Sequence, residues 1–93
     1  MMTAPRFTLG KIVATPGAIA ALKAAQLHPL KLLIRHAHGD WGDLHQFDLD
    51  ANELALRQGL RILSAYVLST GNRIWIITEA DRSVTTLLTP EEY

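Results

Sequence analysis

The fold is decided by the C-terminal part of the chain, where residues 62–88 read ILSAYVLSTGNRIWIITEADRSVTTLL. Isoleucine, valine, threonine and aromatic residues, which favour strands, gather there in three runs separated by turn-forming residues. The predicted strands are Ile62 to Leu68, Ile74 to Thr78 and Val84 to Leu88. Connections as short as residues 69–72 and 80–82 join antiparallel neighbours. The stretch therefore predicts a three-stranded antiparallel meander, which Pro90 ends.

A further strand and a helix are predicted at the start of the chain. Residues from Phe7 to Ala14 have strand character that Gly10 weakens, so this strand belongs at a sheet edge or contains a bulge. Thr15 can cap free N–H groups, and Pro16 suits the first position of a helix. The apolar stripe of that helix extends to Ala25.

Two more helices are predicted between this helix and the meander. The first covers Pro29 to Ala37, and Gly39 is placed to supply a left-handed stop. An ordered loop is expected from Asp40 to Leu49. Asp50-Ala51-Asn52-Glu53 resembles a capping box, and the helix that it opens ends at Gly59. The predicted fold is α+β, in the order β-α-α-α-β-β-β, with three helices packed on one face of a small antiparallel sheet.

Composition limits the classes of function. A chain of 93 residues is expected to form one domain over residues 1–93, with residues 1–6 as a flexible N-terminus. Nine basic and nine acidic residues cancel, which argues against a nucleic-acid partner. The absence of cysteine fits a cytoplasmic location, and no apolar run is long enough to span a membrane. A core this small gives marginal stability, which a homodimer would improve.

The densest polar cluster lies between Arg35 and His45. Within it His36, Asp40 and Asp43 are candidates for a divalent metal site or for general acid–base catalysis, with Glu79 as a possible base. The histidine spacing does not match the i, i+4 pairing of a helical zinc motif, so spacing assigns none of them as catalytic or metal-ligating. The alternative gives them local roles, in which the two aspartates cap turn N–H groups and His36 caps the helix C-terminus.

Five residues are candidates for binding a protein partner or a second copy: Trp41, Trp75, Glu79, Asp81 and Arg82. Glu79 and Asp81 could position Arg82 as an anchor for an anion or a partner. The alternative is a hairpin turn in which Asp81 bonds its own backbone and Arg82 pairs on the surface. Trp75 and Tyr66 mark a contact surface if they lie on an uncovered sheet face, and otherwise the aromatic residues, Trp41 included, pack in the core.

Three stretches resemble a known family: residues 10–18, residues 36–44 and residues 77–93. They read GKIVATPGA, then His36 with GDWGDL, and finally ITEADRS through to PEEY. From about Leu9 to Tyr93 the chain looks like the small bacterial proteins of plasmids and integrative elements labelled "plasmid-related protein" or "type I restriction subunit M". The restriction label does not fit, because 93 residues cannot hold a methyltransferase domain. The resemblance implies a genetic context without an established activity.

These observations lead us to expect an accessory protein of mobile genetic elements that acts as a non-enzymatic protein-interaction module. It would use the Trp75 surface or the corner formed by Glu79, Asp81 and Arg82. The chain has no glycine-rich phosphate loop, no serine in a nucleophile elbow and no helical zinc motif, and we predict no cofactor. The alternative is a small metal-dependent hydrolase or nuclease that uses His36, Asp40 and Asp43, and a third hypothesis is a DNA-associated regulator.

Overall fold

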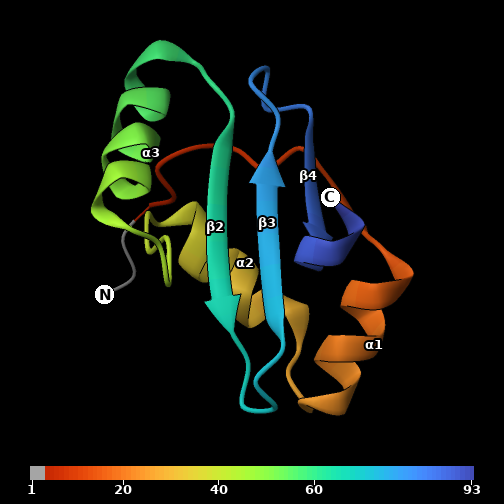
Figure 1. Ribbon diagram of the computed structural model, residues 1–93. Helices are drawn as coiled ribbons and strands as arrows, with labels where there is room; N and C mark the ends of the chain where they lie inside the picture. The colour runs from red at the N-terminus through yellow and green to blue at the C-terminus, as the bar shows by residue number, and fades with distance from the viewer. Residues whose placement is uncertain (1–3) are drawn as a thin grey trace.

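The computed structural model describes residues 4–93, which form a four-stranded mixed sheet and three α-helices (Figure 1). The α+β class and the predicted order of elements are confirmed. The elements are β1 (Lys11–Ala14), α1 (Pro16–Ala24), α2 (Pro29–Ala37), α3 (Gln46–Gln58), β2 (Ile62–Val67), β3 (Arg73–Thr78), β4 (Val84–Leu88) and a 3-10 turn, η1 (Pro90–Glu92).

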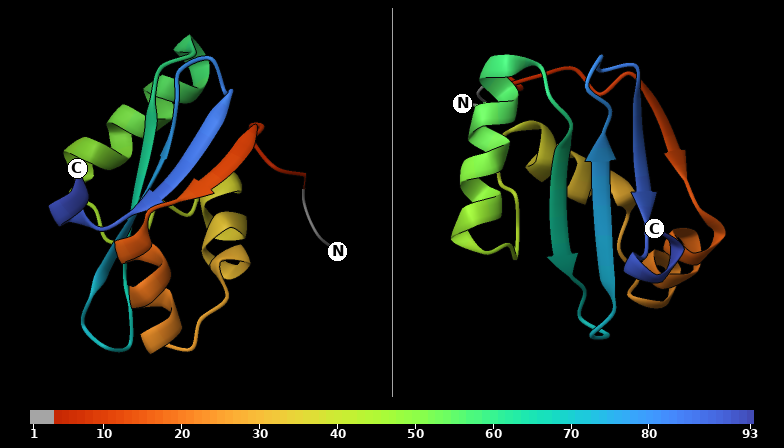
Figure 2. Two further views of the ribbon diagram at one scale, coloured as in Figure 1. Left: turned by 90° about the vertical axis from the view of Figure 1, so that its right-hand side faces the viewer. Right: turned by 45° about the horizontal axis from the view of Figure 1, so that its top comes forward.

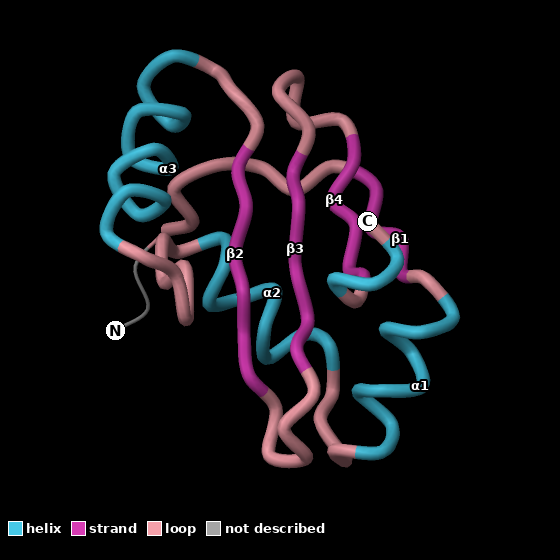
Figure 3. Tube along the Cα trace, in the orientation of Figure 1, coloured by secondary structure: helices cyan, strands magenta, loops and turns pink. Residues whose placement is uncertain are grey.

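The strand order in the sheet is β1-β4-β3-β2. The predicted meander is confirmed, because β2, β3 and β4 pair antiparallel with their neighbours. β1 instead pairs parallel with β4, with Ile12 opposite Thr85, so the sheet is mixed where we expected an antiparallel one. All three helices and two strands separate β1 from β4 along the chain, and a long connection permits the parallel direction. Figure 3 labels β1 beside β4.

The helices leave one face of the sheet open. α2 crosses behind β2 and β3 in Figure 1, α1 lies below and to the right of β4, and α3 lies beside the outer edge of β2. Side chains of α1 and α2 form the main core with Tyr66, Ile74, Ile76 and Leu87 of the sheet. A second cluster joins α3 to β2 through Trp41, Ala55 and Ile62. Among residues 4–93 no α-helix crosses the opposite face, although the short η1 packs there against β3, on the side away from α1 and α2 in the left view of Figure 2.

The predicted helix caps at Thr15, Gly39 and Gly59 are confirmed. The Thr15 hydroxyl accepts a hydrogen bond from the Ala18 N–H at 3.1 Å, and Pro16 is the first residue of α1. Gly39 after α2 and Gly59 after α3 have φ angles of 86° and 66°, in the left-handed region that glycine reaches without a Cβ clash. Local sequence was therefore sufficient to place these helix ends.

The predicted start of the first strand is wrong, because β1 begins at Lys11 and not at Phe7. Gly10 has a φ of 65°, and a Cβ there would lie 2.3 Å from the Ser83 carbonyl oxygen. Backbone in this conformation cannot continue a strand. Gly10 thus allows the chain to turn tightly against the β3–β4 corner before pairing begins.

The predicted start of α3 is also wrong, because the helix begins at Gln46 and contains Asp50 well inside it. Asp50 accepts a hydrogen bond from the Gln46 side chain, one helical turn earlier. Glu53 does not cap the helix and instead accepts hydrogen bonds from Trp41 and Arg6. The buried face of α3 carries the polar residue Asn52, which interrupts the helical spacing of apolar residues. Because of this interruption, the sequence did not reveal that the helix begins one turn before Asp50.

Contacts of Arg6 and Glu92 hold these two residues to the fold. The Arg6 N–H donates to the Ala37 carbonyl at 2.8 Å, and its guanidinium binds both carboxylate oxygens of Glu53. Residues 1–3 of the predicted flexible segment lie outside the described residues. At the other end, Glu92 accepts hydrogen bonds from the Thr15 hydroxyl at 2.5 Å and the Gly17 N–H at 3.0 Å. These donors lower the pKa of Glu92 to about 2.

Among the described residues, no helix combines the length and the apolar character that crossing a membrane requires.

The outer edge of β2 is closed by polar groups of the neighbouring chain. The Asn52 side chain donates to the Leu63 carbonyl at 2.6 Å and accepts from the Leu63 N–H at 3.1 Å. Farther along, the Ala65 N–H donates to the Trp41 carbonyl, and the Ala65 carbonyl accepts from the Asp43 N–H. Backbone groups that would otherwise pair with another strand are therefore occupied within the chain.

We expect Asn52→Ala to lower the free energy of unfolding by about 1–3 kcal/mol, because it leaves the N–H and C=O of Leu63 without partners. Urea denaturation measures this loss, and hydrogen exchange should speed up at the Leu63 amide. Arg57→Ala, an exposed position on the same helix, is the matched control. Equal stability of the two variants would contradict the assigned role of Asn52.

Candidate functional site

The open sheet face carries a partly exposed tryptophan. Side chains alternate along a strand, so Trp75 and Ile77 point to the open face while Ile74 and Ile76 point to the helices. Tyr66 is 1% exposed and belongs to the helix-covered core, and its burial raises the pKa of its hydroxyl to about 12. Of the two strand aromatics, Trp75 alone meets the condition that we set for a contact surface.

Two hollows meet at Trp75. One, of about 300 Å³, is lined by Arg61, Leu63, Trp75, Ile77 and Tyr93. The other, of about 380 Å³, shares Leu63 and Trp75 with the first and extends to Asp43, His45, Asp48 and Arg73. We call the surface made by Arg61, Leu63, Trp75, Ile77 and Tyr93 the Trp75 face. Its floor is apolar, and charged groups stand at its ends.

One wall of the Trp75 face is built by Tyr93. Its ring meets the Trp75 ring edge to face, with centroids 5.5 Å apart. Its hydroxyl accepts a hydrogen bond from Arg61 at 3.0 Å, and Arg61 also pairs with Glu79 at 3.6 Å. Glu79 therefore stands at the rim of this surface. Arg61, Leu63 and Tyr93 were not among the predicted binding residues. Strand alternation places Leu63 and Ile77 on one face once the register is known.

Asp81 and Arg82, which were predicted to form a binding site, lie in the turn between β3 and β4 and make contacts within the fold. Asp81 accepts from both the N–H and the hydroxyl of Ser83, as the turn alternative predicted, and these bonds lower the pKa of its carboxyl. Arg82 donates to the Leu60 carbonyl at 2.6 Å and to the Ala55 carbonyl at 3.1 Å. The guanidinium thus caps the C-terminal end of α3, where carbonyl groups lack helical partners. Neither sequence interpretation of Arg82 anticipated this contact.

The expected cap role of His36 is wrong, because this residue lies in the core with no exposed surface. One ring nitrogen, Nδ1, lies 2.5 Å from the Ser64 hydroxyl, and the other, Nε2, lies 2.8 Å from the Thr78 hydroxyl. The rings of Phe7 and Trp41 pack against the imidazole edge to face. The C-terminal turn of α2 is satisfied instead by His38, whose Nδ1 lies 2.7 Å from the Ile34 carbonyl oxygen.

Hydrogen bonding sets the tautomer of the neutral His36 imidazole. Thr85 donates its only hydroxyl proton to the Leu9 carbonyl, so it must accept from Thr78, 2.7 Å away. Thr78 has then used its proton and accepts from Nε2–H of His36, which leaves Nδ1 to accept from Ser64. Every donor in this buried chain has one acceptor. The neutral Nε2–H tautomer is the form that fits.

A serine hydroxyl beside a histidine nitrogen also occurs in enzymes with an activated serine nucleophile. Such a pair must reach a substrate, whereas Ser64 and His36 are both 0% exposed. The second imidazole nitrogen is held by a threonine and not by the carboxylate that orients a catalytic base. The geometry therefore suits a core hydrogen-bond network and gives no access for acyl transfer.

The other members of the predicted metal cluster point elsewhere. Asp40 binds the Arg35 guanidinium at 2.6 Å, which lowers the pKa of its carboxyl, and also accepts from the Gly42 N–H. Asp43 lies 3.8 Å from Arg73. Among residues 4–93 no group of three or more histidine, cysteine or acidic side chains is placed to hold a metal ion. The structure thus does not bring His36, Asp40 and Asp43 together. The predicted binding residue Trp41 is 4% exposed and packs in the core.

We expect His36 to make folding acid-sensitive. Burial, followed by the charge of Arg82, lowers its pKa from 6.5 to about 4. The unfolded chain therefore takes up this proton first as the pH falls. The His36 contribution should be constant above pH 6.5 and decline by about 3 kcal/mol between pH 6.5 and 4.

Nitrogen-15 NMR should show the Nε2–H tautomer and a titration midpoint near 4, and urea unfolding at several pH values should show the decline. His45→Gln, an exposed position, should leave the decline unchanged. A midpoint near 6.5 for His36 would contradict the assignment.

Comparisons of the chain with models of known families, with curated proteins and with solved structures each found no match. The family resemblance based on residues 10–18, 36–44 and 77–93 therefore stays a prediction.

Proposed function

We propose that this protein is a non-enzymatic protein-interaction module that binds a segment of another protein on the Trp75 face. The observation that carries the proposal is the position of Trp75, partly exposed on the open sheet face where two hollows meet. Tryptophan and tyrosine are enriched among the residues that contribute most binding energy in interfaces. Trp75 and Tyr93 form such a pair at one end of an apolar floor.

The shape and charge of the Trp75 face define the kind of segment that it would accept. A hollow of about 300 Å³ with walls of Trp75 and Tyr93 suits one large aliphatic or aromatic side chain. Asp43, Asp48 and Arg73 line the adjoining hollow. Its two carboxylates outnumber the one guanidinium, which favours a basic residue next in the segment. Arg61 at the opposite end would disfavour a basic residue there. The proposed ligand is therefore an extended segment with an apolar residue followed by lysine or arginine.

The remaining hypotheses have less support from the geometry. The metal-dependent hydrolase or nuclease needs His36 beside Asp40 and Asp43, and these side chains have separate partners. The DNA-associated regulator must contend with a net charge of zero. An accessory role in mobile genetic elements is part of our proposal and rests only on the family resemblance. A protein-binding module is compatible with that context and does not depend on it.

The test is a peptide-display selection on the wild-type chain, with Trp75→Ala as the counter-selection target. We expect enriched peptides to carry an apolar residue followed by a basic one, and to bind Trp75→Ala at least about tenfold more weakly. Fluorescence follows binding directly, because Trp75 is partly exposed while Trp41 is buried.

Ile19→Ala is the matched control, since Ile19 is 56% exposed on α1, away from this face. It should bind the selected peptides like the wild type, and circular dichroism should show that all variants fold. Peptides that bind wild type and Trp75→Ala equally, or a selection that enriches nothing on the wild type, would refute the proposal.

A further inference from the structure

The two edges of the sheet differ in how they end. Asn52 and residues 41–43 occupy the outward backbone groups of β2, whereas the sheet simply ends at β1. The N–H groups of Lys11 and Thr15 donate inward, to the Ser83 and Leu87 carbonyls of the β4 side. Because backbone groups alternate along a strand, the N–H and C=O of Ile12 and Ala14 point away from the sheet.

We propose that two copies of this chain pair antiparallel through their β1 strands to form a homodimer with a continuous eight-stranded sheet. A two-fold axis perpendicular to the sheet pairs residues that face the same side. With Val13 on this axis, Ile12 of each copy lies opposite Ala14 of the other. The outward N–H and C=O groups of Ile12 and Ala14 then form four hydrogen bonds, all within the strand. This inference uses the edge of the sheet and is independent of the Trp75 face.

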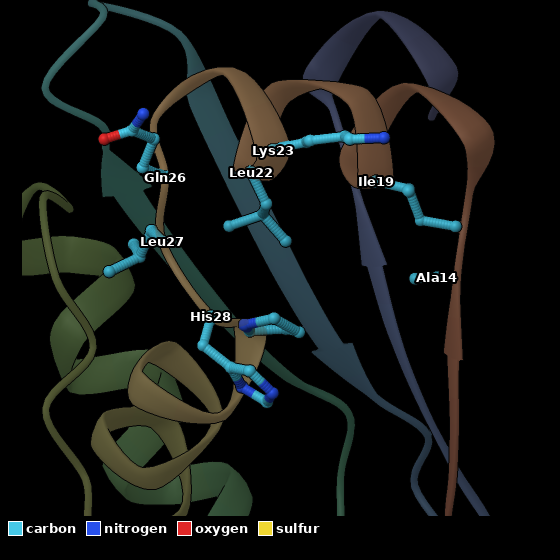
Figure 4. A pocket seen from close by; sticks show the side chains of 8 residues that line it. Ala14, Ile19, Leu22, Lys23, Gln26, Leu27 and His28 are labelled. Carbon is cyan, nitrogen blue, oxygen red and sulfur yellow. The ribbon is translucent and has the colours of Figure 1, made fainter.

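A hollow beside β1 has a shape that favours a second copy as the occupant. It measures about 420 Å³ and is lined by Ala14, Ile19, Leu22 and Leu27, with Ile19 pointing from α1 toward Ala14 in Figure 4. Ile12 is 43% exposed and points to this same helix side of the sheet, since it lines a neighbouring hollow with Ala37 of α2. In the proposed register Ile12 of the second copy stands over the small residue Ala14 and fills the hollow.

Charges also match in this register. Lys11 is the only charged residue of β1, and it lies opposite Thr15 of the second copy and not opposite another lysine. The Thr15 hydroxyl donates to the Glu92 carboxylate at 2.5 Å, so a negative charge stands where the lysine of the other copy arrives. Opposite charges on facing strands stabilise pairing, and like charges weaken it.

The closed β2 edge limits the assembly to two chains. After β1 pairs with β1, each outer edge of the joined sheet is a β2 strand whose Leu63 and Ala65 backbone groups are already bonded. Because these central groups of the edge are occupied, the edge is a poor template for another strand. Because each strand contributes only four residues, the interface is small, and we expect a dissociation constant in the micromolar range.

The first test is sedimentation equilibrium over a concentration series. We expect the wild type to dimerise and Ala14→Arg to raise the dimer dissociation constant at least about tenfold, because the larger side chain excludes Ile12 of the second copy. Val67→Arg is the matched control, since Val67 is 50% exposed on the other edge strand, and it should leave the constant unchanged. A wild type that stays monomeric to about 1 mM, or a dimer that Ala14→Arg does not weaken, would overturn the proposal.

A second measurement uses single cysteines, because the chain contains none. In the proposed register Val13 meets Val13 of the other copy across a close antiparallel pair, where the two Cβ atoms come within disulfide reach. Val13→Cys should therefore oxidise to a covalent dimer under mild conditions, and Val67→Cys should stay monomeric at the same concentration. Equal rates for the two variants would show that β1 does not pair with β1.

Discussion

The chain of hydrogen bonds through His36 is the interaction on which the other contacts depend. It connects α2 to β2 through Ser64, to β3 through Thr78, and by way of Thr85 to β4 and the Leu9 carbonyl. A buried polar group without a partner is costly, and among the described residues every buried side-chain nitrogen or oxygen has one. The network therefore specifies the register of helix and strands, because a shift of any member leaves at least one group unpaired.

The same core explains why one face and one edge of the sheet stay open. α1 and α2 supply the apolar side chains that cover the helix side, and α3 is drawn to the β2 edge by Asn52, Trp41 and the Arg82 cap. With all three helices on these two sides, the strands expose Trp75 on the far face and Ile12 at the β1 edge. The two proposed binding surfaces are thus consequences of where the helices pack, and they can act independently because they lie on different sides of the sheet.

Prediction succeeded where a residue acts on its immediate neighbours. Thr15 and Pro16 start α1, Gly59 ends α3, and the β2–β3–β4 meander follows from strand propensity and short turns. Prediction failed where a contact with a residue distant in the sequence determines the structure. The early start of α3 was not predicted, because the buried face of this helix includes the polar residue Asn52. The partner of Asn52 is a strand backbone, which the local sequence pattern does not reveal.

The sequence by itself determined the class and order of elements, because propensity, caps and turns are properties of short segments. It also placed Trp75 among the candidate binding residues, together with Trp41. Only the tertiary structure decided that His36 is a core residue, that Arg82 caps a helix, and that Trp75 and Tyr93 share one surface. Those outcomes depend on which side chains meet across distances of many residues, and the packing of α1 and α2 on one face and of α3 at the β2 edge sets those meetings.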